Sequence, residues 1–377
     1  RNMSTKPHSI ALKTQPTGRS MTAIGCPPIF CKSNHVSHAP YARNAQRTMS
    51  TNVDAPAEAS KVIVEVDENV RSPGAPAPSV ETILHALLPF RYVDHTHADA
   101  VLSVTNTPGG EERVREIYGR RVVVIPYVMP GFALAKQANE VSRAHPDVEG
   151  LVLLKHGIFS MGATAEEAYV RMIDLVTMAE QRLAKATRKI FAGATLPATP
   201  AKVEEIAPIL RGLMSIPAKS GGREASQRFV FEFRSNPAIL AFVNGREIAR
   251  YSQQGPVTPD HAIRTKNVPL VVPAPEAGKL DAFKAGTQAA LQKFAADYHA
   301  YFTRYNGKQV VAKKELDPVP RVVLVPGVGL FGVGNTSKDA KIAADLAETT
   351  VEVIADAASV RPWYPPSKAN IRLLPFL

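Results

Sequence analysis

Two histidines that are separated by a single residue, His95 and His97, can hold one metal ion together. In an extended strand the side chains of residues i and i+2 point to the same face, so both imidazoles can reach the same cation. A third histidine lies further along the chain, in Lys155-His156-Gly157. A catalytic zinc ion commonly takes three protein ligands and leaves one position open. The histidines therefore indicate a zinc site, although such a pair also arises by chance in chains that bind no metal.

A glutamate upstream has the chemistry of a proton-transfer group. Glu81 follows Pro78-Ser79-Val80 and precedes an apolar run that predicts a short helix with Ser79 near its N-cap. In the first helical turn Glu81 is stabilised by the helix dipole, and it can act as a general base if burial raises its pKa. The alternative is an ordinary acid at a helix start. We interpret His85, four residues later, as a packing residue rather than a fourth ligand.

Helices and strands that position these residues alternate from about residue 71 onward. We expect helices at 111–118, 131–144 and 165–189, and strands around His95, at 121–126 and at 150–156. The last of these strands is apolar and ends at His156, where loops form binding sites. The long helix that follows begins at Thr164-Ala165-Glu166-Glu167, which has the spacing of a capping box.

Three segments, 78–85, 93–100 and 155–162, resemble the class II aldolase/adducin family. The similarity runs from about residue 71 to about residue 360, and within the family it is greatest to the aldolase part of bifunctional proteins that join a rhamnulose-1-phosphate aldolase to a short-chain dehydrogenase. The resemblance implies one Zn²⁺ ion held by His95, His97 and His156, with Glu81 as the acid/base residue. The implied reaction is aldol cleavage of a phosphorylated ketose, such as rhamnulose 1-phosphate, to dihydroxyacetone phosphate and an aldehyde.

The fold implied by the resemblance is α/β, a three-layer α/β/α sandwich around a mixed, mostly antiparallel sheet. The phosphate-binding loop that begins this fold and the dehydrogenase domain are not recognisable, so we expect a truncated first copy. Ser79 and Gly157 are the candidate substrate-binding residues that remain. Since relatives place the site near a subunit boundary, a homo-oligomer is expected. A non-catalytic, adducin-like binding module is the alternative function.

The second half echoes the first. Residues 156–164 resemble residues 328–336 at an offset of 172, and Asp260-His261 can be aligned with Asp94-His95 at an offset of 166. We therefore predict a degenerate second copy. In this alignment valine replaces His156 and isoleucine replaces His97, so the second copy is not expected to bind zinc.

A glycine-rich segment offers a competing motif. Gly327, Gly329 and Gly332 follow an apolar strand with the G-x-G-x-x-G spacing of a dinucleotide site. The predicted repeat accounts for the same glycines as a turn between a strand and a helix. NAD binding is therefore the third hypothesis, behind the aldolase and the adducin-like module.

Composition indicates a globular α/β protein of two domains, since the 377 residues are 45% hydrophobic. The net charge is +11, but residues 1–53 contain seven basic and no acidic residues. The remaining chain is nearly balanced, so a nucleic-acid partner is not indicated. No apolar run approaches the about 20 residues that cross a bilayer, so a membrane partner is not expected either.

The basic segment at the start has the composition of a transit peptide for a mitochondrion or plastid. Because the chain begins with Arg1, the segment can equally be untranslated sequence, and the protein would then be cytoplasmic. Its two cysteines, Cys26 and Cys31, are weak evidence for any site. The domains expected are a leader at 1–70, an aldolase-like domain at 71–190, a linker at 191–222, a degenerate repeat at 223–360 and an unstructured tail at 361–377.

Overall fold

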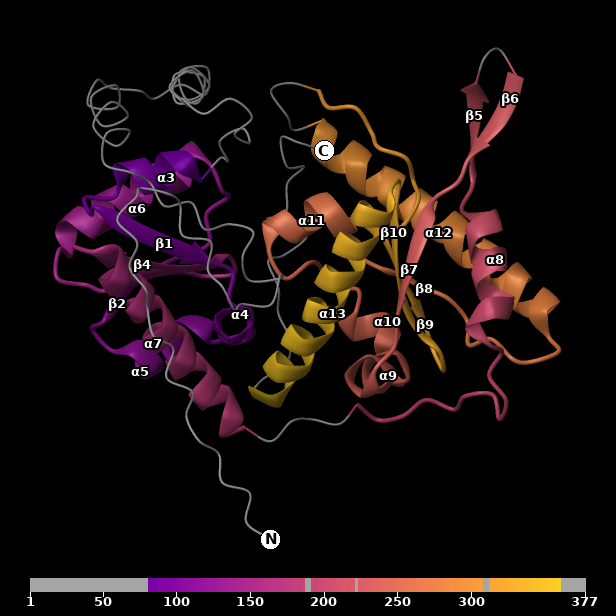
Figure 1. The fold of residues 1–377 in the computed structure, drawn as a ribbon, viewed down its shortest axis with the longest axis horizontal. Helices are drawn as coiled ribbons and strands as arrows, with labels where there is room; N and C mark the ends of the chain where they lie inside the picture. Colours follow the sequence, from indigo (N-terminus) through magenta and orange to yellow (C-terminus); the bar gives the residue numbers. More distant parts are fainter. Residues whose placement is uncertain (1–80, 187–190, 221–222, 308–311, 361–377) are drawn as a thin grey trace, which may run out of the picture. The chain divides into compact units, whose positions relative to one another are not determined.

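The structure, a computed structural model, describes residues 81–186, 191–220, 223–307 and 312–360 (Figure 1). Three of the expected features lie outside the described residues: the leader, the tail and Ser79. Within this part of the chain the fold contains two four-stranded sheets, each with its own helices.

The first sheet is mixed and mostly antiparallel, in agreement with the expected fold class. Its strands lie in the order β1 (Tyr92–Thr96), β4 (Gly157–Gly162), β3 (Gly150–Leu153) and β2 (Val122–Ile125). β4 pairs antiparallel with both β1 and β3, and β2 pairs parallel with β3. The central strands β3 and β4 are buried along their whole length, as their apolar sequences predict.

Helices cover both faces of this sheet. One face packs against α3 (Thr82–Leu87) and α6 (Phe132–Ala144), and the other against α4 (Asp99–Thr105), α5 (Gly110–Tyr118) and α7 (Ala165–Ala184). Side chains alternate between the two layers because successive residues of a strand point to opposite faces. Leu151 and Leu153 lie in the cluster with α3 and α6, whereas Val152 lies in the cluster with α4, α5 and α7. The three-layer arrangement is confirmed.

Several sequence-based boundaries are confirmed and others are wrong. β2, α5 and α6 lie where the sequence placed them, and the Thr164 side chain accepts the backbone N–H of Glu167 at the start of α7. α7 ends at Ala184, before the expected Lys189. α4 was not expected at all.

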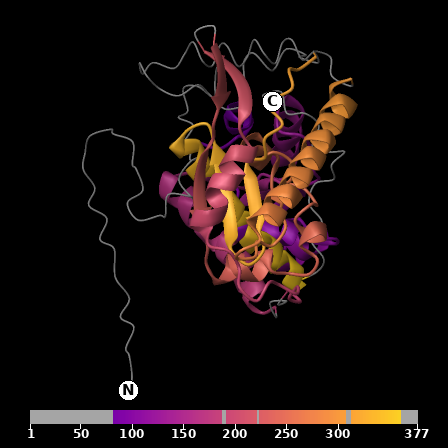
Figure 2. The ribbon, with the colours of Figure 1, turned by 90° about the vertical axis from the view of Figure 1, so that its right-hand side faces the viewer.

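The second sheet repeats the strand order of the first. Its strands are β7 (Val230–Arg234), β10 (Gly329–Gly334), β9 (Val322–Val325) and β8 (Leu270–Val271), with two antiparallel pairs and one parallel pair. One face packs against α8 (Val203–Leu213) and α12 (Leu280–Asn306), the other against α9 (Pro237–Val243), α10 (Ile248–Tyr251) and α13 (Ser337–Val360). A separate hairpin of β5 (Ile216–Ser220) and β6 (Arg223–Gln227) extends away from this sheet (Figure 2).

α8 lies within the stretch that was expected to link the two domains. Its buried residues Ile206 and Leu210 belong to the apolar core of the second sheet. The domain boundaries remain a prediction, but part of the expected linker packs as a helix of the second half.

The structure corrects one part of the predicted repeat. β9, β10 and α13 each begin 172 residues after β3, β4 and α7, as the first alignment required. Asp260 and His261, however, lie in α11 (Pro259–Thr265), a helix, so their alignment with the β1 strand is wrong. The strand in the place of β1 is β7, in which Phe233 faces Phe331 as His95 faces Phe159 in the first sheet. Phe233 therefore occupies the position of His95, and Ser235 that of His97.

The two halves are joined by α4. Its Leu102 lies in an apolar cluster of the second sheet, and its Ser103 Oγ donates to Val353 O at 3.4 Å. The amide of Asn106, just after α4, donates to Val257 O at 3.2 Å. In the part of the chain that the structure describes, the helices are all too short or too polar to cross a bilayer.

Candidate metal centre

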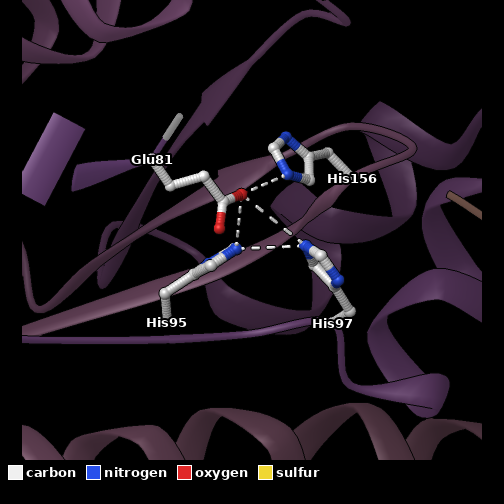
Figure 3. Close-up of side chains that lie close together, drawn as sticks. All are labelled: Glu81, His95, His97 and His156. Atoms are coloured by element: carbon white, nitrogen blue, oxygen red, sulfur yellow. Dashed lines mark hydrogen bonds and ion pairs between the residues drawn. The ribbon is translucent and has the colours of Figure 1, made fainter. Parts of the chain in front are cut away.

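One glutamate and three histidines converge at the edge of the first sheet (Figure 3). One ligand atom from each of Glu81, His95, His97 and His156 lies within 4.8 Å of those of the others. The structure thus brings together the four residues that the sequence proposed.

Each residue comes from a different local structure. His95 lies in β1 and His97 directly follows it. The expectation that His156 ends a strand is wrong. β3 stops at Leu153, and His156 lies in the turn before β4. Glu81 is the N-cap of α3 rather than a residue of its first turn, since the helix begins at Thr82.

A single oxygen of Glu81 faces all three imidazoles. Its Oε1 lies 2.9 Å from His156 Nε2, 3.2 Å from His95 Nε2 and 3.8 Å from His97 Nε2. The Nε2 atoms of His95 and His97 are only 3.1 Å apart. All three histidines therefore direct the same nitrogen, Nε2, to one small volume (Figure 3).

The donor set fits a zinc ion. His95 Nδ1 lies 3.0 Å from the carbonyl oxygen of Ile158, which only accepts, so Nδ1 carries the hydrogen and the lone pair of neutral His95 is on Nε2. Such an outer hydrogen bond is typical of metal-binding histidines. Two nitrogens on one tetrahedral zinc, with bonds of about 2.0–2.1 Å, lie roughly 3.3 Å apart, close to the observed His95–His97 separation.

The backbone beside the histidines leaves no room for a side chain at Gly157. A Cβ atom there would lie 2.7 Å from Thr96 O, 2.9 Å from His97 Cδ2 and 3.0 Å from His95 Cε1. Gly157, expected to bind substrate, thus has a packing role between β1 and β4. His95 also stacks on Phe159 at 3.9 Å between ring centroids, and His85 packs against the same ring.

The histidines shift the pKa of Glu81 downward. Burial by itself raises the pKa of Glu81, but the charge of His95 and the hydrogen bonds from the three histidines bring that pKa well below its usual value. Burial lowers the pKa of His156. The pKa of His97 is raised: burial opposes this, but the hydrogen bond to Glu81 and the charge of Asp260 outweigh it. The condition that burial raises the pKa of Glu81 is therefore not met, and Glu81 is an ionised carboxylate here.

Sequence reasoning missed one acidic residue at this site. Asp260 Oδ2 lies 3.5 Å from His97 Nε2, although Asp260 belongs to α11 of the second half. No local sequence signal marks it, because its position depends on how α11 packs against the first half.

The glycine motif of the second half has a different setting from a dinucleotide site. Gly329 and Gly332 lie within β10, which pairs antiparallel with β9, so a strand rather than a helix follows the turn at Gly327. A Cβ at Gly332 would lie 2.3 Å from Ala340 O in α13. The hypothesis of a strand-to-helix loop at these glycines is wrong, both for NAD and for the repeat.

Comparison with known proteins covers both halves. The sequence pattern described as "Class II Aldolase and Adducin N-terminal domain" matches residues 37–183, and the pattern described as "Aldolase class II, second domain" matches residues 201–373. The chain belongs to the class II aldolase/adducin family. The match to this family extends beyond the residues 71–360 that we expected, at both ends.

A relative of the chain is "Uncharacterized oxidoreductase YuxG" of Bacillus subtilis (strain 168). It is 32% identical over 290 residues, which make up 76% of this chain and 41% of the relative. The chain thus spans about two fifths of the length of this relative.

Two solved structures are similar to parts of the chain. The N-terminal class II aldolase domain of a conserved protein from Thermoplasma acidophilum is 37% identical, over 38% of this chain and 64% of that one, with a TM-score of 0.33. The L-fuculose-1-phosphate aldolase from Thermus thermophilus is 22% identical, over 30% of this chain and 65% of that one, with a TM-score of 0.23.

Proposed function

We propose that this protein is a zinc-dependent aldehyde-lyase that cleaves a phosphorylated ketose, such as rhamnulose 1-phosphate, to dihydroxyacetone phosphate and an aldehyde. The observation that carries the proposal is the convergence of three Nε2 atoms beside a carboxylate in a chain of the class II aldolase/adducin family. His95, His97 and His156 are the proposed ligands.

Retro-aldol cleavage requires two proton movements. The bond between the carbon bearing the hydroxyl and the carbon next to the carbonyl breaks, its electrons remain on the latter as an enediolate, and the hydroxyl loses a proton as the aldehyde forms. His95, His97 and His156 would hold the zinc ion, which would supply Lewis acidity for the negative charge that develops during cleavage. Glu81 is placed for both movements, because its Oε1 lies 2.9 Å from His156 Nε2 and 3.2 Å from His95 Nε2, and its carboxylate can accept the hydroxyl proton and then return a proton to the enediolate carbon.

The metal ligands differ in their exposure, which orients the site. The side chains of His95 and His156 are almost fully buried, whereas that of His97 is 19% exposed. Substrate therefore approaches from the side of His97. Burial of the other two histidines excludes water from the inner side, which strengthens the electrostatic interactions of the site.

The test combines two measurements on the same purified protein: zinc content, and release of dihydroxyacetone phosphate from rhamnulose 1-phosphate. We expect one zinc per chain and cleavage by the wild type. His97→Ala should lose both, whereas Glu81→Gln should retain zinc and lose cleavage. Asp281→Asn, an exposed change on α12, is the control and should alter neither measurement.

Each other outcome has a defined meaning. Wild-type protein that binds no stoichiometric zinc contradicts the proposal. Zinc without cleavage of any phosphorylated ketose indicates the adducin-like binding module. Full cleavage by Glu81→Gln would remove Glu81 from its proposed role while leaving the metal site in place.

A further inference from the structure

We propose that Asp260, a residue of the second half, is a further carboxylate of the metal centre and strengthens its affinity for a cation. This rests on the proposed function only in that the histidines bind a metal ion. The second half, in which other side chains occupy the positions of the histidines, would thus complete the site of the first.

Asp260 lies at the outer side of the cluster. Its Oδ2 is 3.5 Å from His97 Nε2, the same nitrogen that faces Glu81 at 3.8 Å. This separation is longer than a charge-assisted hydrogen bond of about 2.7–2.9 Å, so the two groups are a charge pair rather than a tightly bonded one. His97 thus lies between two carboxylates, one from each half.

The backbone that carries Asp260 is fixed to the first half. Thr258 is fully buried and caps α11 by accepting the N–H of His261 at 3.4 Å, and Pro259 occupies the first helical position. Immediately before them, Val257 O accepts the amide of Asn106 from the first half. Two residues after Asp260, Ala262 packs against Met129, so the chain contacts the first half both before and after Asp260.

The next residue provides an independent sign that this region is prepared for a ligand. His261 is 7% exposed, its Nδ1 is 2.7 Å from Thr258 Oγ1, and its buried Nε2 has no hydrogen-bond partner among the described residues. Burial, and to a smaller extent the charge of His97, lower the pKa of His261 to about 3. The basic residue of α11, Arg264, lies in its last turn, whereas Asp260 lies in its first turn beside His97.

A carboxylate at this distance acts on a cation through Coulomb attraction. The side chain of Asp260 is 38% exposed, so the effective dielectric constant is well above that of a dry interior and the attraction is sensitive to salt. Substitution of Asp260 should therefore weaken metal binding in proportion to the charge removed, and more strongly at low ionic strength.

The experiment measures Co²⁺ and Zn²⁺ affinity of the full chain after metal removal. We compare the wild type with Asp260→Asn, Asp260→Lys and Asp260→Glu at ionic strengths of about 0.02 M and 0.5 M. We expect about a tenfold weaker affinity for Asp260→Asn, a larger loss for Asp260→Lys, near-wild-type affinity for Asp260→Glu, and smaller losses at the higher salt. Asp281→Asn and Asp281→Lys, at the start of α12 on the far face of the second sheet, are matched controls and should bind normally.

The measurements distinguish failure of this inference from failure of the proposed function. Wild-type binding with unchanged affinity in Asp260→Asn and Asp260→Lys overturns this inference and leaves the proposed metal site intact. Equal losses in the Asp281 controls, or losses that do not depend on salt, also overturn it, because they indicate a general or purely structural effect. If the wild type binds no metal, the proposed function and this inference both fail. Thermal unfolding of the metal-free variants checks that each still folds.

Discussion

The two sheets have the same strand order, but among the described residues only the first gathers a set of metal ligands. Register and the constant offset place Phe233, Ser235 and Val328 where the first half has His95, His97 and His156. Phe233 contacts the Phe331 ring as His95 stacks on Phe159. The positions tolerate apolar or small side chains without loss of the fold, so the histidines of the first half are not required by the architecture.

Unlike the histidines, the glycine next to these positions is present in both halves. Gly157 and Gly329 are equivalent, and each approaches the neighbouring strand closely: a Cβ at Gly157 would lie 2.7 Å from Thr96 O, and one at Gly329 would lie 2.5 Å from Arg234 O. Since both halves retain glycine here while only one retains the histidines, the strand pairing needs the glycines and the metal needs the histidines.

Replacement of His156 by the valine of the second half should give the largest effect. His156→Val removes one of three proposed ligands and leaves an apolar side chain in a buried position, so metal affinity should fall by about a thousandfold or more. Equilibrium dialysis against buffered Zn²⁺ measures this loss.

The fold should survive the same change. The metal-free variant should unfold at a temperature close to that of the metal-free wild type. Valine removes the hydrogen bond between His156 Nε2 and Glu81 Oε1, but it also removes a buried imidazole whose Nδ1 makes no hydrogen bond to the described residues. A variant that keeps tight zinc binding, or that fails to fold, would break the comparison of the two halves.

The matched pair Gly157→Ala and Gly329→Ala should give the next largest effect. Both introduce a Cβ into a space that is too small, and overpacking of this kind costs about 1–3 kcal/mol of unfolding free energy. Gly329 also has a φ of +148°, so alanine there adds backbone strain.

Metal affinity distinguishes the members of this pair. Only at Gly157 does the added methyl press on two proposed ligands, so only Gly157→Ala should weaken zinc binding, by about tenfold, as measured by competition with a chelating dye. Equal zinc affinity in both variants would show that the imidazoles move freely and that the site is not held by the β1–β4 pairing.

The sequence predicted the parts of the molecule that depend on local signals. The apolar run before Pro126 predicts β2, and the spacing of His95 and His97 predicts that they share a site. α4, which begins at Asp99, was missed because its N-cap residue Ala98 offers no side-chain cap and because it contains β-branched residues that are typical of strands. Its formation depends on burial between the two halves.

Properties that arise from tertiary contacts were missed for the same reason. The pKa of Glu81 depends on three histidines that reach it from β1 and from the turn before β4. Asp260 looked like a strand residue by alignment, and only the position of α11 beside His97 gives it a place in the site. Composition and spacing contain no information about either contact.

The second half buries a lysine side chain, Lys266, and this burial predicts that the stability of the protein depends on pH. Lys266 in the second half is buried, lies 3.8 Å from the centre of the Tyr298 ring and donates to Asp317 O. Burial lowers its pKa to about 7, with the charge of Asp317 opposing the shift. Since an unfolded lysine has a pKa of about 10.4, the unfolded chain binds more protons between these values, and stability should rise as pH increases from about 7 to 10.

Lys266→Met should remove this contribution. The variant should be more stable than the wild type by a few kcal/mol at pH 7, and the difference should shrink toward pH 10, where the lysine is neutral in the folded state and begins to lose its proton in the unfolded one. Denaturant unfolding at several pH values measures it. A difference that is constant with pH would mean that Lys266 stays charged in the folded protein, held by the carbonyl and the ring.

The smallest expected effect concerns the turn between β3 and β4, which contains His156. Lys155 has a φ of +62°, and its counterpart Gly327 in the second half has a φ of +83°, so the turn between the two central strands requires the left-handed conformation in both halves. A non-glycine residue there is strained by roughly 1–2 kcal/mol, which the extra freedom of glycine in the unfolded chain partly offsets.

Lys155→Gly should therefore raise the unfolding free energy by less than about 1 kcal/mol, and Gly327→Lys should lower it by a similar amount. A Cβ at Gly327 would meet only Pro200 at 3.6 Å, so backbone strain rather than a clash sets the cost of the second change. Opposite signs in a denaturant titration would establish that the two turns are equivalent. If Lys155→Gly instead destabilises the protein, the Lys155 side chain contributes more than its backbone strain costs, and the first half retains lysine there because it helps to hold the turn that carries His156.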